Sequence, residues 1–223
     1  MNPKSGSIQF WFGVAITLVG WMALTLSRAK VFEPGTAMTA GIASTGFLVA
    51  ASTPTALGNW FGRWILLGLI GCWFGDVLGP HNFLLGVYAF MAAHFGFVIA
   101  CWVRGLIWSR VAKATIPTLI VSVAVGTALL SEASKEEQIT IWIYTFIISV
   151  MVIAAYGASQ DFRWLFIAAV AFYLSDVLLG LWRYGGNSIY SWFCYPVYYS
   201  ACLMFAYSGW RGSIRTEVET ATG

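Results

Sequence analysis

Two aspartates are the residues of this sequence whose type and setting most strongly indicate chemistry. Asp76 and Asp176 each lie within a long apolar stretch, in the segments RWILLGLIGCWFGDVL and RWLFIAAVAFYLSDVL, which begin at Arg63 and Arg163. An aspartate at the centre of a membrane-spanning helix costs about 2.5–3.5 kcal/mol on the insertion scale. Two such residues predict a site of acid–base chemistry inside a membrane. The alternative is a structural pair that hydrogen-bonds neighbouring helices together.

The two segments align without a gap at an offset of 100 residues and share Arg, Trp, Asp, Val and Leu at equivalent positions. Each aspartate follows its arginine by 13 residues, about 20 Å along an α-helix, so we expect both carboxyls at a similar depth. The similarity predicts two parallel four-helix repeats, over about 8–103 and 114–209. The following helices match only faintly, through pairs such as Phe97 and Phe205. The alternative is the general likeness of any two apolar helices.

The composition indicates which elements position these acids. Of the 223 residues, 59% are hydrophobic and 9% charged, and the mean hydropathy is +0.76. A soluble domain is about 25% charged, so a water-soluble globule is excluded. A net charge of +3 is too small to favour binding of nucleic acid. Because the apolar stretches are continuous rather than alternating, they predict helices and an all-α polytopic transmembrane bundle.

Eight stretches are about long enough to cross a bilayer. We expect a single transmembrane domain over 1–210 and a cytoplasmic tail over 211–223. The predicted spans are 8–27, 33–52, 60–79, 83–103, 114–131, 138–157, 162–182 and 188–209.

The distribution of basic residues predicts the orientation of the bundle. Eight spans place both termini on one side, where eight of the 12 Lys and Arg residues lie, so we expect both ends in the cytoplasm. The chain shows no transit peptide or retrieval signal, and we expect a bacterial plasma membrane rather than the endoplasmic reticulum.

Further polar side chains accompany the aspartates in or near the spans. We expect a polar pocket between the spans at 60–79, 83–103, 162–182 and 188–209. Arg183, near its outer mouth, is a candidate to hold a phosphate, although an arginine there can equally extend to the interface without a ligand. The other candidate binding residues are His94, Tyr88, Tyr144, Tyr173, Ser175, Tyr195 and Tyr199.

Several kinds of membrane protein are excluded by the residues that are missing. All four lysines fall outside the span interiors, so a retinal Schiff base has no candidate. His81 and His94 lie roughly 20 Å apart on one helix and cannot clamp a haem. Motifs for a serine esterase, a zinc protease or a nucleotide site are absent. His94 and the aspartates differ in expected depth by about 10 Å. We therefore expect no metal and no cofactor, and we read the four cysteines as small core residues.

The predicted spans contain an ordered set of short motifs: Gly75-Asp76, Gly86, Phe90, His94, Ser175-Asp176 and Tyr198-Tyr199. This set resembles the YhhN/TMEM86 family of lysoplasmalogenases. The resemblance implies an eight-helix membrane enzyme that hydrolyses the vinyl ether of lysoplasmalogens to a fatty aldehyde and glycerophosphocholine or glycerophosphoethanolamine. It also implies that the two intramembrane aspartates of the family correspond to Asp76 and Asp176. Phe95-Gly96-Phe97 departs from the residues that often follow the family's histidine.

The implied chemistry suits two carboxyls buried in lipid. Vinyl ether hydrolysis begins with protonation of a carbon, and desolvation favours the neutral acid that can supply this proton. We expect one aspartate to be the acid and the other the base, with a lysophospholipid substrate, surrounding membrane lipid and no nucleic acid as partners. The sequence leaves open which aspartate is the acid and the oligomeric state. The alternatives are a proton- or cation-coupled transporter and a structural subunit of a membrane complex.

Overall fold

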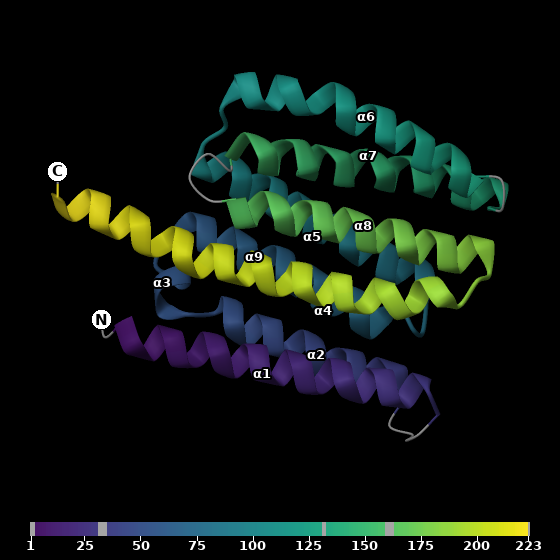
Figure 1. Cartoon of the computed structure of the whole chain (residues 1–223), viewed down its shortest axis with the longest axis horizontal. Helices are drawn as coiled ribbons and strands as arrows, with labels where there is room; N and C mark the ends of the chain where they lie inside the picture. The colour runs from purple at the N-terminus through teal and green to yellow at the C-terminus, as the bar shows by residue number, and fades with distance from the viewer. Residues whose placement is uncertain (1–2, 31–34, 131–132, 159–162, 223) are drawn as a thin grey trace.

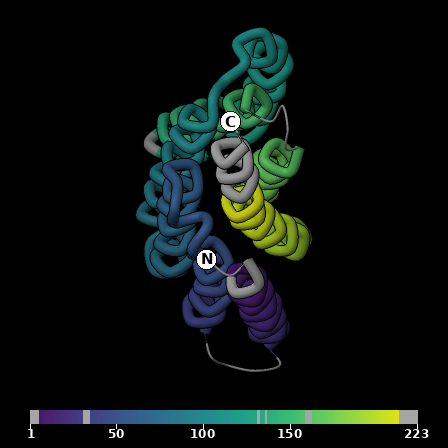
Figure 2. Tube along the Cα trace, turned by 90° about the vertical axis from the view of Figure 1, so that its left-hand side faces the viewer, coloured from purple at the N-terminus to yellow at the C-terminus, as the bar shows by residue number. Residues whose placement is uncertain are grey.

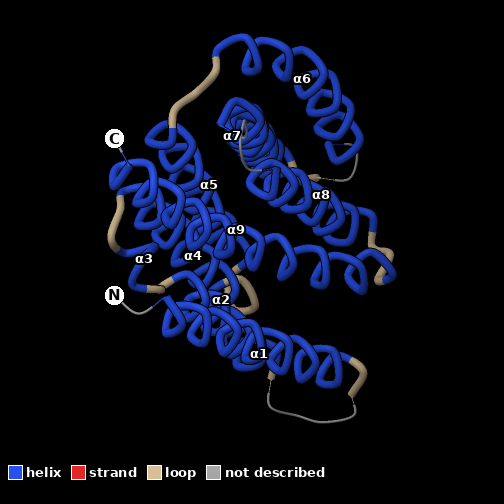
Figure 3. Tube along the Cα trace, turned by 60° about the vertical axis from the view of Figure 1, so that its left-hand side comes forward, coloured by secondary structure: helices blue, strands red, loops and turns tan. Residues whose placement is uncertain are grey.

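The computed structural model describes residues 3–30, 35–130, 133–158 and 163–222, and this part of the chain contains helices and no strand (Figures 1 and 3). The prediction of an all-α bundle is confirmed. Figure 1 shows long helices lying side by side, with both termini at the same end of the bundle. The helices are α1 (Pro3–Arg28), α2 (Thr36–Ala51), α3 (Pro54–Leu57), α4 (Trp60–Leu78), α5 (Phe83–Arg104), α6 (Trp108–Leu130), α7 (Lys135–Ala158), α8 (Arg163–Gly185) and α9 (Ile189–Thr222).

Local residues fix where the central helices begin and end. The side chain of Asn59 accepts a hydrogen bond from the backbone N–H of Gly62 (2.9 Å) and caps α4. Asn82 caps α5 in the same way through the N–H of Leu85 (3.2 Å). Gly105, with a φ of 99°, follows the last residue of α5; positive φ favours glycine. These caps set the register of the helices that carry Asp76 and His94.

Within the described part of the chain, six helices are long and apolar enough to cross a membrane: α1, α4, α5, α6, α7 and α8. The predicted span 33–52 is shorter than expected, because α2 has 16 residues and Pro54 begins the separate helix α3. The predicted span 188–209 coincides, from Ile189 onward, with the first part of α9, whose helical backbone continues through the predicted tail to Thr222. The ends of the predicted spans at 33, 131 and 162 lie outside the described residues.

The short helix α2 packs among protein helices through small residues. A side-chain carbon added at Gly13 of α1 would lie 2.3 Å from the backbone nitrogen of Ala50, and one at Gly20 would lie 2.4 Å from that of Ala43. Small residues let helix backbones approach closely inside a membrane. Helix α2 therefore buries its polar Ser44 against the protein interior.

The helices pack on one another in the same order within two sets of four. In the first set, α1 packs on α2, α2 on α4 and α4 on α5. In the second set, α6 packs on α7, α7 on α8 and α8 on α9. The fourth helix of each set also packs on the second helix of the other set: α5 on α7, and α9 on α2. Figures 1 and 2 place α1 and α6 at opposite edges of the bundle. The two sets are called the first and second halves below.

Candidate functional site

A cavity of about 590 Å³ contains both intramembrane aspartates. It is bounded by α4, α5, α8 and α9, the four helices between which we expected a polar pocket. Helix α2 contributes Thr36 and Ala40 to the lining. Pro80 and His81 of the α4–α5 turn and Arg183 near the end of α8 also line it, so it opens at the end of the bundle opposite the two termini. Its polar lining residues include Asp76, Ser175, Asp176 and Tyr195.

The cavity lies where the packing of the two halves differs. Helix α4 of the first half packs directly on α9 of the second. The equivalent pair, α8 and α5, lacks such close backbone packing, although both helices are described throughout. Phe90 of α5 and Leu179 of α8 line the space between them. The wider separation of the α5 and α8 backbones thus leaves room for a cavity that both aspartates line.

Asp76 is held by two hydroxyl groups. Its Oδ2 atom is hydrogen-bonded to the Ser44 hydroxyl of α2 and accepts a hydrogen bond from the Tyr198 hydroxyl of α9 (2.9 Å). The Ser44 hydroxyl also donates to the Ala40 carbonyl oxygen at 2.8 Å. Asp76 is 8% exposed, so its carboxyl is nearly enclosed by protein.

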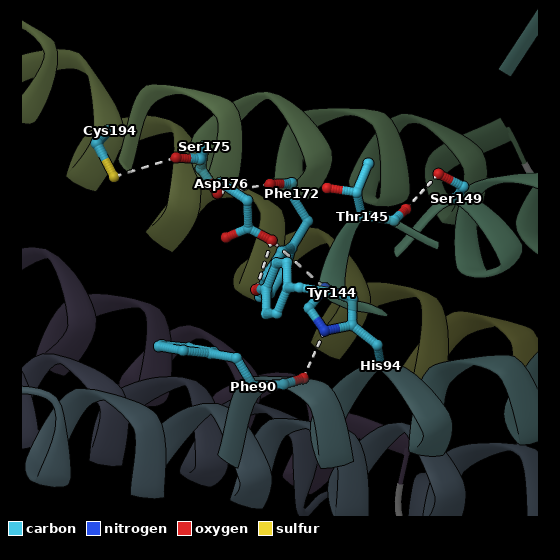
Figure 4. Close-up of polar contacts among 9 residues, drawn as sticks. All are labelled: Phe90, His94, Tyr144, Thr145, Ser149, Phe172, Ser175, Asp176 and Cys194. Carbon is cyan, nitrogen blue, oxygen red and sulfur yellow. Dashed lines mark hydrogen bonds and ion pairs between the residues drawn. The ribbon is translucent and has the colours of Figure 1, made fainter. Parts of the chain in front are cut away.

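Asp176 is held by a hydroxyl and an imidazole (Figure 4). Its Oδ2 atom accepts a hydrogen bond from the Tyr144 hydroxyl of α7 (2.8 Å) and lies 3.5 Å from Nε2 of His94 on α5. The other ring nitrogen of His94, Nδ1, contacts the carbonyl oxygen of Phe90. His94 is fully buried, so the orientation of its ring is fixed on both sides.

Aromatic rings pack beside the partners of both aspartates. The Phe172 ring meets the His94 ring edge to face at a centroid distance of 4.9 Å and the Tyr198 ring at 5.4 Å. The Phe90 ring lies 5.8 Å from that of Tyr198. These rings place apolar surface beside both acids, and an apolar environment disfavours an unpaired charge.

One partner of each aspartate is related to the other by the same sequence offset as the aspartates themselves. Ser44 precedes Asp76 by 32 residues and Tyr144 precedes Asp176 by 32 residues, so the two donors are related by the same offset of 100. Each aspartate also contacts a residue on the fourth helix of the opposite half, Tyr198 on α9 or His94 on α5. The surroundings of each aspartate are called its corner below. The two corners therefore draw their contacts from equivalent helices, but the contacting groups differ chemically.

Seven of the ten predicted site residues meet at this site. Asp76, Asp176, Ser175, Tyr195 and Arg183 line the cavity, and Tyr144 and His94 contact Asp176. The hydroxyl of Ser175 donates to the Phe172 carbonyl oxygen (2.7 Å). Arg183 lies with its guanidinium carbon 4.7 Å from the Phe83 ring centre and a nitrogen 3.7 Å from Glu137.

Three of the predicted tyrosines, Tyr88, Tyr173 and Tyr199, are not among the residues that line the cavity. Tyr88 is 51% exposed and faces away from the protein. The Tyr173 hydroxyl contacts Ser122 (3.2 Å), and its side chain lines a separate groove beside α6. Tyr199 is buried near Phe47 and is not among the residues that line the cavity. Each lies one to three positions from a residue of the site, and each position turns the side chain by about 100° around the helix.

The expected difference in depth between His94 and the aspartates is wrong for Asp176. Positions counted from opposite helix ends describe backbones, whereas the two side chains extend toward each other across the gap between α5 and α8. Even so, the described residues contain no group of three His, Cys, Asp or Glu side chains arranged to hold a metal ion.

Two residues of the site, Ser44 and Tyr198, were not predicted as functional from the residues alone. Tyr198 was noted in the tyrosine-rich part of the last predicted span and in the Tyr198-Tyr199 motif, but it was not among the ten predicted site residues. Ser44 has a clear signal in retrospect, because Ser44-Thr45 aligns with Tyr144-Thr145 at the offset of 100 that relates the aspartates.

Comparison with known proteins gives one match. No curated protein and no solved structure matches the chain. The model of the YhhN family matches residues 35–209, which include the two aspartates and every side chain that contacts them. Since the match covers well over half of the 223 residues, the chain is a membrane protein that belongs to the YhhN family.

Proposed function

We propose that this protein is a membrane hydrolase that cleaves the vinyl ether bond of lysoplasmalogens. The products are a fatty aldehyde and glycerophosphocholine or glycerophosphoethanolamine. The observation that supports the proposal is the pair of nearly buried carboxyls, Asp76 and Asp176, in one cavity that opens at an end of the bundle. Membership of the YhhN family agrees with it.

The reaction needs an acid and a base. A carboxylic acid protonates the β-carbon of the vinyl ether and leaves an oxocarbenium ion, to which water adds with loss of a proton to a base. The resulting hemiacetal then collapses to aldehyde and alcohol. A positioned acid or base contributes about 10²–10⁴-fold to such a rate. Glycosidases use paired carboxyls around a related cation, which is an analogy of chemistry and not of fold.

The lining of the cavity suits an amphiphilic substrate. Arg183 and His81 lie at the mouth, where a phosphate can be held outside the apolar interior. A second, smaller cavity of about 70 Å³ reaches Asp176 from between α5, α7 and α8, and Thr140, Ile141 and Leu179 are among its lining residues. We assign the phosphate end of the lipid to the mouth and the first carbons of the alkenyl chain to this mainly apolar side. The vinyl ether then lies near both carboxyls.

The direct test is aldehyde release by the purified protein in mixed micelles. Wild type is expected to release fatty aldehyde from a lysoplasmalogen and none from the matching lysolipid with a saturated ether, which has no double bond to protonate. Asp76→Asn and Asp176→Asn should each lower the rate by about 10²–10⁴-fold. Thr127→Val, on the exposed outer surface of α6, is the control and should keep the wild-type rate.

The other readings predict different results. A transporter would carry ions or solutes across liposomes without releasing aldehyde. A structural role for the aspartates would leave both asparagine variants folded and active. Wild-type protein that is folded and releases no aldehyde would overturn the proposed activity.

A further inference from the structure

The hydrogen atoms around Asp76 can be counted from its contacts. The hydroxyl of Ser44 has one hydrogen and two close oxygens, the Ala40 carbonyl oxygen at 2.8 Å and Oδ2 of Asp76. A carbonyl oxygen cannot donate, so the Ala40 contact uses the hydrogen of Ser44. The contact between Ser44 and Asp76 then requires a hydrogen that belongs to the carboxyl of Asp76. Tyr198 donates to the same carboxyl oxygen at 2.9 Å, because this contact is shorter than the 3.5 Å between its hydroxyl and the Cys72 carbonyl oxygen.

Charge leads to the same assignment for Asp76. Among the described residues, its polar side-chain contacts are the neutral hydroxyls of Ser44 and Tyr198, and it forms no ion pair. A carboxylate without a cation in an 8% exposed position carries a large desolvation cost. The neutral acid avoids that cost and satisfies both hydroxyl contacts.

The count differs at Asp176. The only hydrogen of the Tyr144 hydroxyl points at Oδ2 of Asp176. His94 uses Nδ1 to contact the Phe90 carbonyl oxygen, which can only accept, so Nδ1 carries a hydrogen. Its Nε2 atom is buried, has no hydrogen-bond partner of normal geometry and faces Oδ2 of Asp176 at 3.5 Å. One hydrogen between Nε2 and Oδ2 satisfies this contact, and with that hydrogen on Nε2 the ring of His94 is a cation directed at a carboxylate.

We infer that the two aspartates have different roles, with Asp76 keeping its own proton as the acid and Asp176 acting as a carboxylate whose proton resides on His94. The roles in catalysis rest on the proposed function. Asp76 gives its proton to the β-carbon, and Asp176 accepts a proton from the water that attacks the oxocarbenium ion. In the collapse of the hemiacetal, Asp176 returns this proton to the departing glycerol oxygen and Asp76 takes the hemiacetal hydroxyl proton. Both groups then regain their starting states.

In this assignment His94 is a positioning residue. It does not need to touch the substrate, because it acts by keeping Asp176 ionised. The Phe90 carbonyl oxygen fixes which ring nitrogen faces the acid, and Phe172 packs against the ring. A merely structural histidine would leave the protonation of Asp176 unchanged when it is replaced.

Infrared spectroscopy can test the assignment without any measurement of activity. The chain has three aspartates, so an Asp161→Asn background with carboxyl-labelled aspartate leaves two labelled groups. At neutral pH we expect one isotope-shifted carbonyl band of a protonated carboxyl. The band should disappear in Asp76→Asn and persist in Asp176→Asn. Asp76→Glu, which keeps a carboxyl, should remove the labelled band while preserving the fold, and it replaces the asparagine variant if that variant does not fold.

Nuclear magnetic resonance completes the test. The chain has two histidines, so ¹⁵N-histidine labelling with a His81→Gln comparison identifies the His94 signals, which should be those of an imidazolium. His94→Asn should create a second protonated-carboxyl band, because Asp176 then keeps its proton. A band lost in Asp176→Asn instead of Asp76→Asn, a neutral His94 ring, or no protonated band in wild type would each overturn the assignment. Aldehyde release, measured separately, tests the proposed activity on its own.

Discussion

The corners around Asp76 and Asp176 receive contacts from equivalent helices, but the side chains that make these contacts differ. Each aspartate lies on the third helix of its half, receives a contact from the second helix of that half and another from the fourth helix of the opposite half. At Asp76 these partners are two hydroxyls, whereas at Asp176 one of them is the imidazole of His94. The comparison teaches that a repeat can supply two acids in equivalent positions while single side chains from the other half distinguish their roles.

The halves also differ in how tightly their helices close around the acids. Near the centre of the molecule, Phe97 of α5 stacks on Phe205 of α9, with ring centroids 4.0 Å apart and planes 3° apart. Away from this pair, α4 packs on α9 but α5 and α8 leave space. The opening therefore lies on the side of Asp176, and Asp76 is reached through the same cavity.

Among the residues that differ between the two corners, His94 is the one whose replacement should lower kcat most. In His94→Gln, Asp176 keeps a proton and loses its function as a base, so kcat should fall by about 10²-fold or more while KM changes little. Aldehyde release at saturating substrate measures this change.

A double-mutant cycle separates this role from simple packing. If His94 acts only through Asp176, the double variant His94→Gln/Asp176→Asn should be no slower than Asp176→Asn alone. Losses that multiply would contradict the link between the two residues.

The two tyrosine donors should differ in importance. Tyr144→Phe removes a hydrogen bond to a charged carboxylate, worth about 1.5–3 kcal/mol, and should lower kcat by about tenfold to a hundredfold. Tyr198→Phe removes one to a neutral acid, worth about 0.5–1.5 kcal/mol, and should lower kcat by about two- to tenfold. Tyr156→Phe, in the separate groove beside α6, controls for loss of a tyrosine hydroxyl. A larger loss for Tyr198→Phe would reverse the assignment of charge.

Hydropathy and the repeat predicted much of this arrangement from sequence. The apolar stretches located the helices, and the shared position of the two aspartates predicted one pocket for both. Hydropathy does not report the rotation of a helix about its axis, which depends on packing between helices. For this reason Tyr199 was expected at the site and its neighbour Tyr198 occupies it.

Hydropathy alone also did not predict the length of α2 or its role in the site. Its small residues resemble those of a weak membrane span, and they serve a close approach to α1 through Gly13 and Gly20. The importance of Ser44 depends on that approach and on the contact of α2 with α4. Extending the repeat alignment beyond Arg63 and Arg163 toward the N-terminus would have paired Ser44 with Tyr144.

Alanine substitutions at two glycines, Gly71 and Gly180, can test how tightly the helices of each half are packed. In Gly71→Ala the new carbon would lie 2.9 Å from the backbone of Ala93 on α5, and such overpacking costs about 1–3 kcal/mol of unfolding free energy. In Gly180→Ala it would lie 2.8 Å from the end of the Leu129 side chain, which can rotate away. Alanine also favours the helix by up to about 1 kcal/mol. Thermal unfolding in detergent should show a lower Tm for Gly71→Ala and little change for Gly180→Ala. Equal losses would contradict the tighter packing of α4 on α5.

The smallest effect is expected at the mouth of the cavity, where Arg183 and Glu137 form a partly exposed pair with side chains 50% and 22% exposed. Exposed pairs contribute about 0–1 kcal/mol to stability, so neither Arg183→Gln nor Glu137→Gln should change the Tm measurably. Arg183→Gln should raise KM for a lysoplasmalogen several-fold with kcat unchanged, because a phosphate contact made equally in the ground and transition states is lost.

Two controls sharpen this last comparison. An alkenyl glycerol that lacks the phosphate should show the same KM with Arg183→Gln and wild type. Glu137→Gln removes a carboxylate that competes with the phosphate for Arg183, so its KM for the lysoplasmalogen should stay level or fall. A rise in KM for both variants, or a rise that persists without the phosphate, would show that Arg183 shapes the mouth instead of binding the head group.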